Sequence, residues 1–402
     1  MLRVAHVIQA VDDRSGGTSS AFLEVLAALA TQPDLAPVAY SIRPPDTDAA
    51  ASAIRAHPDR WRLADSLGRT LAPGALGRLV RDDLARGGID VLHLHGIWSP
   101  DLLAAARAAR RAGVPIVWQP HGMLLSHAIA KKALKKKLFM RLGLAAALRG
   151  TAAYVFCSAG ERDDSVLPAG CDLSRRHVIV LPVTIPANEA DIPRLRAEGR
   201  ERLGLQADAP LVVFLGRLHP VKRLELTLRA FAAAAPRLPQ SARLALLGSG
   251  DEGYVRSLRD LAASLGVADR VLWPGWISGE DKWRMLAAAD ALILNSVHEN
   301  FGYTVPEALG VHTPVVMTDN LSLAADVAAA GPMARIVRPD PAPVADAIAS
   351  LLTAPPAPEA RADARRWVLS TFSPTAIGSA LAGLYRALPA PARAGATEAA
   401  RA

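Results

Sequence analysis

Two carboxylates, Glu299 and Glu307, flank a short loop whose residue types suit the binding of a sugar phosphate. The preceding residues 291–296, ALILNS, form an apolar run of strand length that ends in polar residues. Pro306 lacks an N–H and has a fixed φ, so we expect a helix to begin near residues 304–305. Glu299 would then lie in the loop at the end of the strand, and Glu307 in the first turn of the helix.

Between these acids, the backbone amides of residues 301–305 are expected to point outward at the helix N-terminus, where the helix dipole favours an anion. This geometry suits a ligand with a phosphate in its middle and hydroxyl-bearing rings at both ends, such as a nucleotide sugar. The structural alternative is a capping glutamate beside an unrelated loop acid. Two acids around Asn300, Phe301 and Gly302, directly after a strand, favour the binding site.

A pair of cations follows another apolar strand. This strand ends in Gly216, and Arg217 and Lys222 then stand five residues apart before the next expected helix. Two cations beside a helix entrance can clamp a diphosphate and neutralise the charge that grows as it leaves. The alternative is a pair of solvated surface charges. The order strand, Gly, Arg, Pro, Lys favours the phosphate site.

The first half of the chain carries weaker candidates. Gly16 and Gly17, after the first expected strand, permit close approach of a backbone to a ligand, although such a glycine pair can also be an ordinary turn. His121 follows a later expected strand, and this location favours a ligand contact over a purely structural role. His93 and His95 either line an acceptor site or merely cap their strand.

Strands and helices alternate along the chain, which predicts a doubly wound α/β architecture with parallel strands. Twelve β-branched runs fall into two series, which predict two Rossmann-like domains. The expected strands are residues 3–9, 38–42, 91–95, 115–119, 153–157, 178–181, 210–215, 243–247, 271–273, 291–295, 314–317 and 334–337.

The domain boundaries follow from composition. We expect an N-terminal domain over residues 1–185, a C-terminal domain over residues 186–372, a helix over residues 373–390, and a disordered alanine/proline-rich tail over residues 391–402. A length of 402 residues also favours two domains over one.

Composition limits the partners and the location. The formal charge of +8 suggests acidic partners, but no aromatic-studded basic motif supports nucleic acid. The two cysteines lack metal-ligand spacing and are typical of reduced cytosolic thiols. No apolar run approaches the roughly 20 residues that span a bilayer, so we expect a cytoplasmic protein. The segment from Lys131 to Leu144 is either a solvated helix or, through Lys131 to Arg141, a contact with an anionic membrane.

Taken together, these motifs resemble the retaining glycosyltransferases of family 4, which have the GT-B fold. The resemblance spans nearly the whole chain and includes the N-terminal glycine loop, GRLHPVK, LGSGDE and the Glu-x7-Glu spacing of Glu299 and Glu307. It implies two Rossmann-like domains facing across a cleft, with the last helix crossing back to the N-terminal domain. The C-terminal domain would bind the nucleotide sugar, and the N-terminal domain the acceptor.

The resemblance also implies roles for the site residues. Arg217 and Lys222 would hold the diphosphate, Gly16 and Gly17 would approach it, and Glu307 would bind the ribose. The donor sugar would meet Glu299, the backbone amides of Asn300, Phe301 and Gly302, and, near the transfer site, His121. The catalytic set is therefore His121, Arg217, Lys222 and Glu299.

The sequence departs from the family pattern at Asn300, where glycine is frequent, so this side chain can add a hydrogen bond to sugar or phosphate. The base-binding region, residues 271–278, carries two tryptophans and leaves the base open. Because no Asp-x-Asp motif stands in a suitable loop, we expect no metal and no other cofactor. HLHGIW and QPHGML look like members that build bacterial surface polysaccharides.

The expected reaction moves a sugar from a UDP- or GDP-sugar to a hydroxyl of a glycan or lipid-linked acceptor, with retention at the anomeric carbon. Two other functions stay open. A nucleotide-sugar epimerase on a similar scaffold would need no acceptor. A non-catalytic nucleotide-sugar-binding protein would bind the donor without transfer or hydrolysis.

Overall fold

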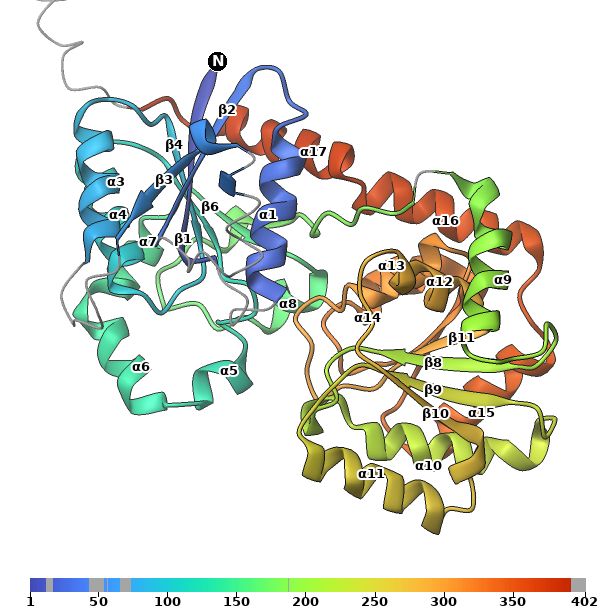
Figure 1. The fold of residues 1–402 in the computed structure, drawn as a ribbon. Coiled ribbons are helices and arrows are strands. Elements are labelled where there is room, and N and C mark those ends of the chain that lie inside the picture. The colour runs from blue at the N-terminus through green and yellow to red at the C-terminus, as the bar shows by residue number, and fades with distance from the viewer. Residues whose placement is uncertain (12–16, 43–53, 56, 66–73, 187, 392–402) are drawn as a thin grey trace, which may run out of the picture. The chain divides into compact units, whose positions relative to one another are not determined.

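The computed structural model describes residues 1–11, 17–42, 54–55, 57–65, 74–186 and 188–391. These residues divide into two compact units. Unit 1 comprises residues 1–182 and 374–402, and unit 2 comprises residues 183–373. In Figure 1, each unit consists of a twisted sheet with helices on both of its faces. The predicted tail, residues 391–402, falls outside the described part except for its first residue.

The sheet of unit 1 has the strand order β3-β2-β1-β4-β5-β6-β7, and every described pairing is parallel. Its central strands are apolar and buried on both faces, as the sequence predicted. The strands are β1 (Leu2–Ala10), β2 (Leu35–Ile42), β3 (Trp61–Ala64), β4 (Val91–His95), β5 (Ile116–Gln119), β6 (Ala153–Phe156) and β7 (Arg176–Val178).

Helices of unit 1 lie in two layers on this sheet. Helices α3 and α4 pack against each other in one layer, and α1 and α17 pack against each other in the other (Figure 1). The helices are α1 (Gly17–Leu29), α3 (Ala75–Ala85), α4 (Pro100–Arg111), α5 (Ser126–Ala130), α6 (Ala133–Phe139), the π-type turn η3 (Met140–Leu144), α7 (Ala145–Arg149), α8 (Ala159–Asp164) and α17 (Pro374–Ala387).

The last helix, α17, belongs to unit 1, which confirms that the chain ends by returning to its N-terminal domain. The approach of α17 to α1 is close: a Cβ on Gly378 would lie 2.4 Å from the carbonyl oxygen of Ala28. A side chain at position 378 would therefore push the two helices apart. Arg386 adds an ion pair to Asp34 at 2.7 Å at the far end of the helix.

Unit 2 contains a second parallel sheet with the order β10-β9-β8-β11-β12-β13. The order reverses between β8 and β11, and the carboxyl ends of strands at such a switch point are where open α/β sheets bind ligands. The strands are β8 (Leu211–Leu215), β9 (Arg243–Leu247), β10 (Val271–Gly275), β11 (Ala291–Leu294), β12 (Val315–Thr318) and β13 (Ala334–Val337).

Helices α10 and α15 pack together on one face of this sheet, and α9 packs with α12 on the other (Figure 1). The helices of unit 2 are α9 (Ile192–Arg202), α10 (Leu224–Ala234), α11 (Glu252–Ser264), α12 (Glu280–Ala288), α13 (Thr304–Gly310), α14 (Ala324–Val327), α15 (Pro341–Thr353) and α16 (Pro358–Phe372).

Three local expectations were wrong. The strand β3 was missed, and β7 lies two residues before its predicted start at Val178. The basic segment does not begin a helix at Lys131, because Lys131 is extended and Lys132 adopts a left-handed conformation at φ 59. Helix α6 therefore starts only at Ala133 and continues into the π-type turn η3.

Candidate functional site

The two predicted groups of unit 2 meet at the switch point of its sheet. Lys222 lies in a short 3-10 turn, Pro220–Lys222, that follows β8, and Glu299 lies in the loop after β11. The ammonium of Lys222 forms an ion pair with Oε2 of Glu299, which also accepts a 3.1 Å hydrogen bond from Ser296 Oγ. The N–H of Val297 donates to the Val221 carbonyl at 2.7 Å and ties the two loops together.

The second carboxylate, Glu307, is more deeply placed. It lies in the first turn of α13, is 7% exposed, and pairs with Lys282 of α12 at 2.7 Å. The Lys282 ammonium also lies 4.4 Å from the ring centroid of Trp283. Lys282 could not be predicted from the sequence, because nothing in its surroundings on α12 marks it as different from a surface lysine.

The loop between the two glutamates is a turn with a buried anchor. Phe301 is 3% exposed, and its ring packs edge-to-face on Tyr303 and Phe372, with centroids 5.0 and 5.9 Å away. Gly302 adopts φ 79. The Val305 N–H donates to the Gly302 carbonyl at 2.9 Å, so the expectation that this amide points outward was wrong. Asn300 is partly buried.

Arg217 is placed differently from Lys222. Its side chain is exposed, and among the described residues no hydrogen bond or ion pair joins it to Lys222 or Glu299. Its backbone is well fixed, because the neighbouring Leu218 N–H donates to the Ser249 carbonyl at 2.8 Å. A Cβ on Gly248 would lie 1.9 Å from the Gly216 carbonyl, so only glycine permits these two loops to approach so closely.

A cavity of about 340 Å³ lies at the same edge of the sheet. Gly250, Arg256, Arg259 and Trp273 are among its lining residues. The Arg259 guanidinium lies 5.2 Å from the ring centroid of Trp273, whereas Trp276 is 65% exposed. The two tryptophans of the predicted base-binding region are therefore not equivalent, since Trp273 lines the cavity and Trp276 is exposed to solvent.

In unit 1, the glycine loop gives little information. Gly16 lies outside the described residues. Gly17 is the first residue of α1, is exposed, and has no atom within 4 Å of the position that a Cβ would take. Nothing described in unit 1 therefore requires glycine at position 17.

His121 follows β5 in a strained turn. It has φ 52, and the next residue, Gly122, has φ 75. Glu161 on α8 fixes this turn, since its Oε1 accepts a hydrogen bond from the Gly122 N–H and its Oε2 accepts one from the Cys157 N–H at 2.7 Å. Burial raises the pKa of Glu161, and these hydrogen bonds act in the opposite direction. Glu161 was not predicted from the sequence, because its surroundings are those of an ordinary helix glutamate.

His93 and His95 neither cap their strand nor line an open site. Both are at most 1% exposed, and they lie beside His6 of β1, with nitrogens of the three rings within 4.8 Å of one another. His95 Nδ1 lies 3.0 Å from His121 Nε2. Burial lowers the pKa of His6 to about 3 and that of His121 to about 4, from an ordinary 6.5. It also holds the pKa values of His93 and His95 well below that value.

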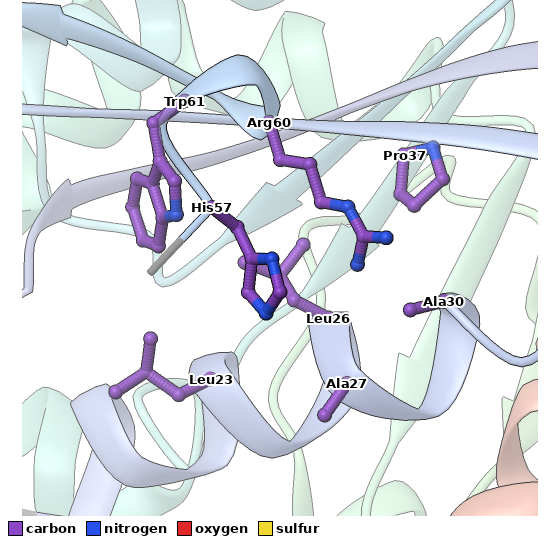
Figure 2. A pocket seen from close by; sticks show the side chains of 8 residues that line it. All are labelled: Leu23, Leu26, Ala27, Ala30, Pro37, His57, Arg60 and Trp61. Atoms are coloured by element: carbon purple, nitrogen blue, oxygen red, sulfur yellow. The ribbon is translucent and has the colours of Figure 1, made fainter. Parts of the chain in front are cut away.

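A separate cavity of about 460 Å³ in unit 1 contains none of the predicted site residues (Figure 2). Leu23 and Leu26 of α1 form its floor, and the side chains of His57, Arg60 and Trp61 close its other side (Figure 2).

The basic segment presents leucines to solvent. Leu134, Leu138 and Leu142 are 83%, 58% and 60% exposed, and they stand four residues apart along α6 and η3. The neighbouring Lys136 places its ammonium 4.9 Å from the ring centroid of Trp98. Within the described residues, no helix is long and apolar enough to cross a membrane.

Family models match both units. The glycosyl transferase 4-like domain matches residues 16–184, and the glycosyl transferases group 1 model matches residues 196–366. A D-inositol 3-phosphate glycosyltransferase of Frankia alni is 31% identical over 278 residues, which cover 67% of this chain and 67% of that protein. One of Xylanimonas cellulosilytica is 33% identical over 239 residues, which cover 58% of this chain and 56% of that protein.

Solved structures share the architecture. HepE of Anabaena, in complex with UDP, superposes with a TM-score of 0.75 at 20% identity, covering 96% of this chain and 100% of that chain. WaaG, a glycosyltransferase involved in lipopolysaccharide biosynthesis, superposes with a TM-score of 0.65 at 17% identity, with coverage of 96% and 100%. The chain belongs to the family 4 glycosyltransferases and has the two Rossmann-like domains of the GT-B type.

Proposed function

We propose that this glycosyltransferase moves a hexose from a UDP- or GDP-sugar to a hydroxyl of a glycan or lipid-linked acceptor in bacterial surface polysaccharide synthesis. Transfer proceeds with retention and without a metal ion. The observation that carries the proposal is the pairing of Lys222 with Glu299 and of Lys282 with Glu307 around the switch point of unit 2. These groups offer cations for a diphosphate and carboxylates for sugar hydroxyls.

The roles follow from this chemistry. Lys222 and Arg217 bind the diphosphate, Glu307 accepts hydrogen bonds from the ribose, and Glu299 accepts them from the donor sugar. For His121, a contact with the donor sugar is proposed. HepE of Anabaena has been crystallised in complex with UDP and with UDP-glucose, which supports a UDP-sugar as the first donor to examine.

The reaction needs no protein nucleophile. The bond between the anomeric carbon and the leaving phosphate oxygen breaks, and the acceptor oxygen bonds to the same face of the carbon. The acceptor proton passes to a phosphate oxygen of the leaving diphosphate. Lys222 and Arg217 stabilise the charge that develops on this group, and such preorganised charges are commonly the largest catalytic contribution.

The enzyme is proposed to work in the cytoplasm at the inner face of the membrane. Support comes from the exposed leucines Leu134, Leu138 and Leu142 beside the lysines of residues 131–137. Apolar side chains flanked by cations suit an anionic membrane surface, where each basic residue contributes about 1 kcal/mol. A lipid-linked acceptor would be reached there.

A ligand screen tests the function. Donor binding at 100 times Kd stabilises a protein by about 2.7 kcal/mol, which corresponds to a rise in Tm of several degrees. UDP, GDP, ADP and their sugar conjugates are compared first. Stabilising donors are then incubated alone, with glycan and lipid-linked acceptors, and with D-inositol 3-phosphate, for which the curated relatives are named.

The outcomes separate the alternatives. A new glycosidic product with retained configuration supports the proposal. A changed sugar formed from the donor alone would instead identify an epimerase. Stabilisation by a donor with neither transfer nor slow hydrolysis would identify a non-catalytic binder. No stabilisation by any nucleotide would overturn the donor site in unit 2.

A further inference from the structure

Four histidines and one tyrosine form a continuous hydrogen-bonded chain inside unit 1. Tyr385 Oη lies 2.7 Å from His93 Nδ1 and 3.3 Å from His6 Nε2. His6 Nδ1 lies 2.9 Å from His95 Nε2, and His95 Nδ1 lies 3.0 Å from His121 Nε2. The chain therefore runs from helix α17, across strands β1 and β4, to the turn that carries His121.

The fold brings these rings together for reasons that are local to each element. His6 and His93 are direct partners in the parallel register of β1 and β4, and His95 follows two residues later on the same face of β4. The rings of His93 and His95 stack with centroids 4.4 Å apart. Tyr385 is 2% exposed and reaches them from α17.

Burial keeps every imidazole ring of the chain neutral. It lowers the pKa values of all four histidines, so the rings are neutral near pH 7. A neutral imidazole carries one N–H and one bare nitrogen. Because His6 and His95 use both of their nitrogens within the chain, the tautomer of one ring dictates the tautomer of the next. Two arrangements satisfy every link and also use the Tyr385 O–H as a donor, and they are opposite in direction.

The end of the chain at His93 selects one of these two directions. His93 Nε2 and Gln119 Oε1 are both buried and lack a hydrogen bond of normal geometry, and β4 and β5 are neighbouring strands. If Tyr385 donates to His93 Nδ1, then His93 Nε2 carries a hydrogen and can donate to Gln119 Oε1. With the Gln119 amide oriented as the structure has it, the opposite direction leaves two bare acceptors side by side, which costs more. An interaction with Gln119 also favours the protonated form of His93.

We propose that Tyr385, His6 and His95 are positioning residues that hold His121 in its Nε2–H tautomer. The His121 Nε2–H donates to His95 Nδ1, and each link behind it runs in the same direction as far as Tyr385. Nδ1 of His121 is left as a bare acceptor, so it receives a hydrogen bond from a hydroxyl of the bound sugar. The identity of that ligand rests on the proposed function, whereas the tautomer does not.

The substitution Tyr385→Phe tests the chain. Without the hydroxyl, His6 Nε2 lacks a partner in both directions, so the chain loses the preference that Tyr385 imposes on it. The reversed direction then becomes populated, and part of His121 changes from the Nε2–H to the Nδ1–H tautomer. In protein labelled with ¹⁵N at histidine, two-bond N–H couplings distinguish these tautomers, and His121→Gln identifies the His121 signals.

Tyr154→Phe is the matched control. Tyr154 is also fully buried in unit 1 and donates its hydroxyl to the Leu148 carbonyl, without contacting a histidine. Both variants lose one buried hydroxyl, but only Tyr385→Phe is expected to change the His121 tautomer. Tyr385→Phe should also lower kcat/KM for the donor by about 10-fold, because a His121 ring with its hydrogen on Nδ1 cannot accept a hydrogen bond from the sugar hydroxyl at that atom. Tyr154→Phe should leave kcat/KM within about 2-fold.

Three results would overturn the proposal. These are an Nδ1–H tautomer of His121 in the wild-type protein, an unchanged tautomer in Tyr385→Phe, or a stoichiometric metal ion bound by His6, His93 and His95 in the purified protein. The wild-type tautomer decides the matter even if Tyr385→Phe does not fold. A tautomer switch in a protein without transferase activity would overturn the proposed function and leave the chain intact.

Discussion

Nζ of Lys282 lies 2.7 Å from Oε1 of Glu307, and this ion pair fixes the orientation of a carboxylate that is only 7% exposed. The lysine comes from α12 and the glutamate from the first turn of α13, so the pair joins two neighbouring helices of unit 2. A carboxylate held in this way keeps one orientation, as the ribose-binding role proposed for Glu307 requires.

Lys282→Met should therefore weaken both the fold and the binding of the donor. Breaking a well-buried ion pair costs about 3–5 kcal/mol, and exposed pairs contribute about 0–1 kcal/mol. Because the Lys282 side chain is 29% exposed, we expect a loss of about 1–2 kcal/mol, measured by urea unfolding. The donor KM should rise about 10-fold with little change in kcat, because binding rather than chemistry is affected.

The control for this variant is Arg202→Met. Arg202 pairs with Asp281, the neighbour of Lys282 on α12, at the same distance of 2.7 Å, but its side chain is 54% exposed. It should lose at most about 1 kcal/mol and leave the donor KM unchanged. Equal effects of the two substitutions would show that Lys282 has no special relation to Glu307.

Lys222→Ala should reduce turnover without unfolding the protein. Removing one preorganised charge from a transition state costs about 10²- to 10³-fold in kcat. Its ion pair with Glu299 is partly solvated, with side chains 18% and 22% exposed, so the loss of stability should stay near 1 kcal/mol. Steady-state kinetics with the donor found in the screen measure the effect.

Arg229→Ala provides the comparison, because Arg229 is an exposed cation on α10, the helix that follows the Lys222 turn. It changes the net charge equally and should leave kcat intact. Near-normal turnover of Lys222→Ala would remove Lys222 from the catalytic set.

Residues at the carboxyl ends of parallel strands were predictable because strand order confines them to one edge of a sheet. Lys222 and Glu299, 77 residues apart, could thus be assigned to one site from the sequence alone. Their direct ion pair was not predicted, since each was assigned to a different part of the ligand. Arg217, predicted by the same rule, lies in the expected loop but contacts neither of them in the part of the chain that the structure describes.

Contacts between residues that only the packing of distant elements brings together could not be predicted from the sequence. His6 and Tyr385 are 379 residues apart and meet only because α17 returns to unit 1, so each alone reads as a core residue. Glu161 acquires its role from the turn at Gly122, which lies on a different connection. The helix break at Lys132 has no glycine or proline to announce it, because a lysine adopts the left-handed conformation there.

Chelation should not affect transfer. The cations of unit 2 that the structure places near the switch point, Lys222 and Lys282, offer charge neutralisation without a divalent ion. Transfer rates after dialysis against EDTA should equal those in Mg²⁺ within experimental error. Loss of activity in EDTA, restored by Mg²⁺ or Mn²⁺, would contradict the metal-independent mechanism.

Leu138→Ser should weaken binding to vesicles that contain anionic lipid. Burying a leucine side chain in an apolar environment contributes about 1.5–3 kcal/mol, and partial insertion at a membrane surface gives a fraction of this. We expect the partition coefficient measured by vesicle sedimentation to fall about 3- to 10-fold. Leu173→Ser is the control, since Leu173 is equally exposed at 54% against 58% but lies outside the basic segment. Equal losses in both variants would argue against a membrane-binding role of α6.

The stability of unit 1 should fall steeply as the pH drops below 6.5. His6 and His121 have folded-state pKa values of about 3 and about 4, and those of His93 and His95 are also lowered by burial. In the unfolded chain all four return to about 6.5, so below this pH the unfolded state binds more protons. Each histidine then costs about 1 kcal/mol between pH 6.5 and 5.5, or about 4 kcal/mol together. Glu161 acts in the opposite direction, because its raised pKa favours the protonated folded state as the pH falls through its folded value.

The thiol of Cys157 can be used to measure the unfolding of unit 1. This thiol is fully buried in unit 1, whereas Cys171 is partly exposed, so a Cys171→Ser protein reacts with a thiol reagent only when unit 1 opens. Labelling over a urea gradient at pH 7.0, 6.5, 6.0 and 5.5, normalised to the rate in fully denatured protein, gives the free energy of opening at each pH. Because each titrating histidine adds one proton to the slope, a slope near four protons at pH 5.5 is expected when all four imidazoles are neutral in the fold. A slope near zero would mean that at least some of these rings are already protonated in the native protein. A neutral chain from Tyr385 to His121 could not then exist.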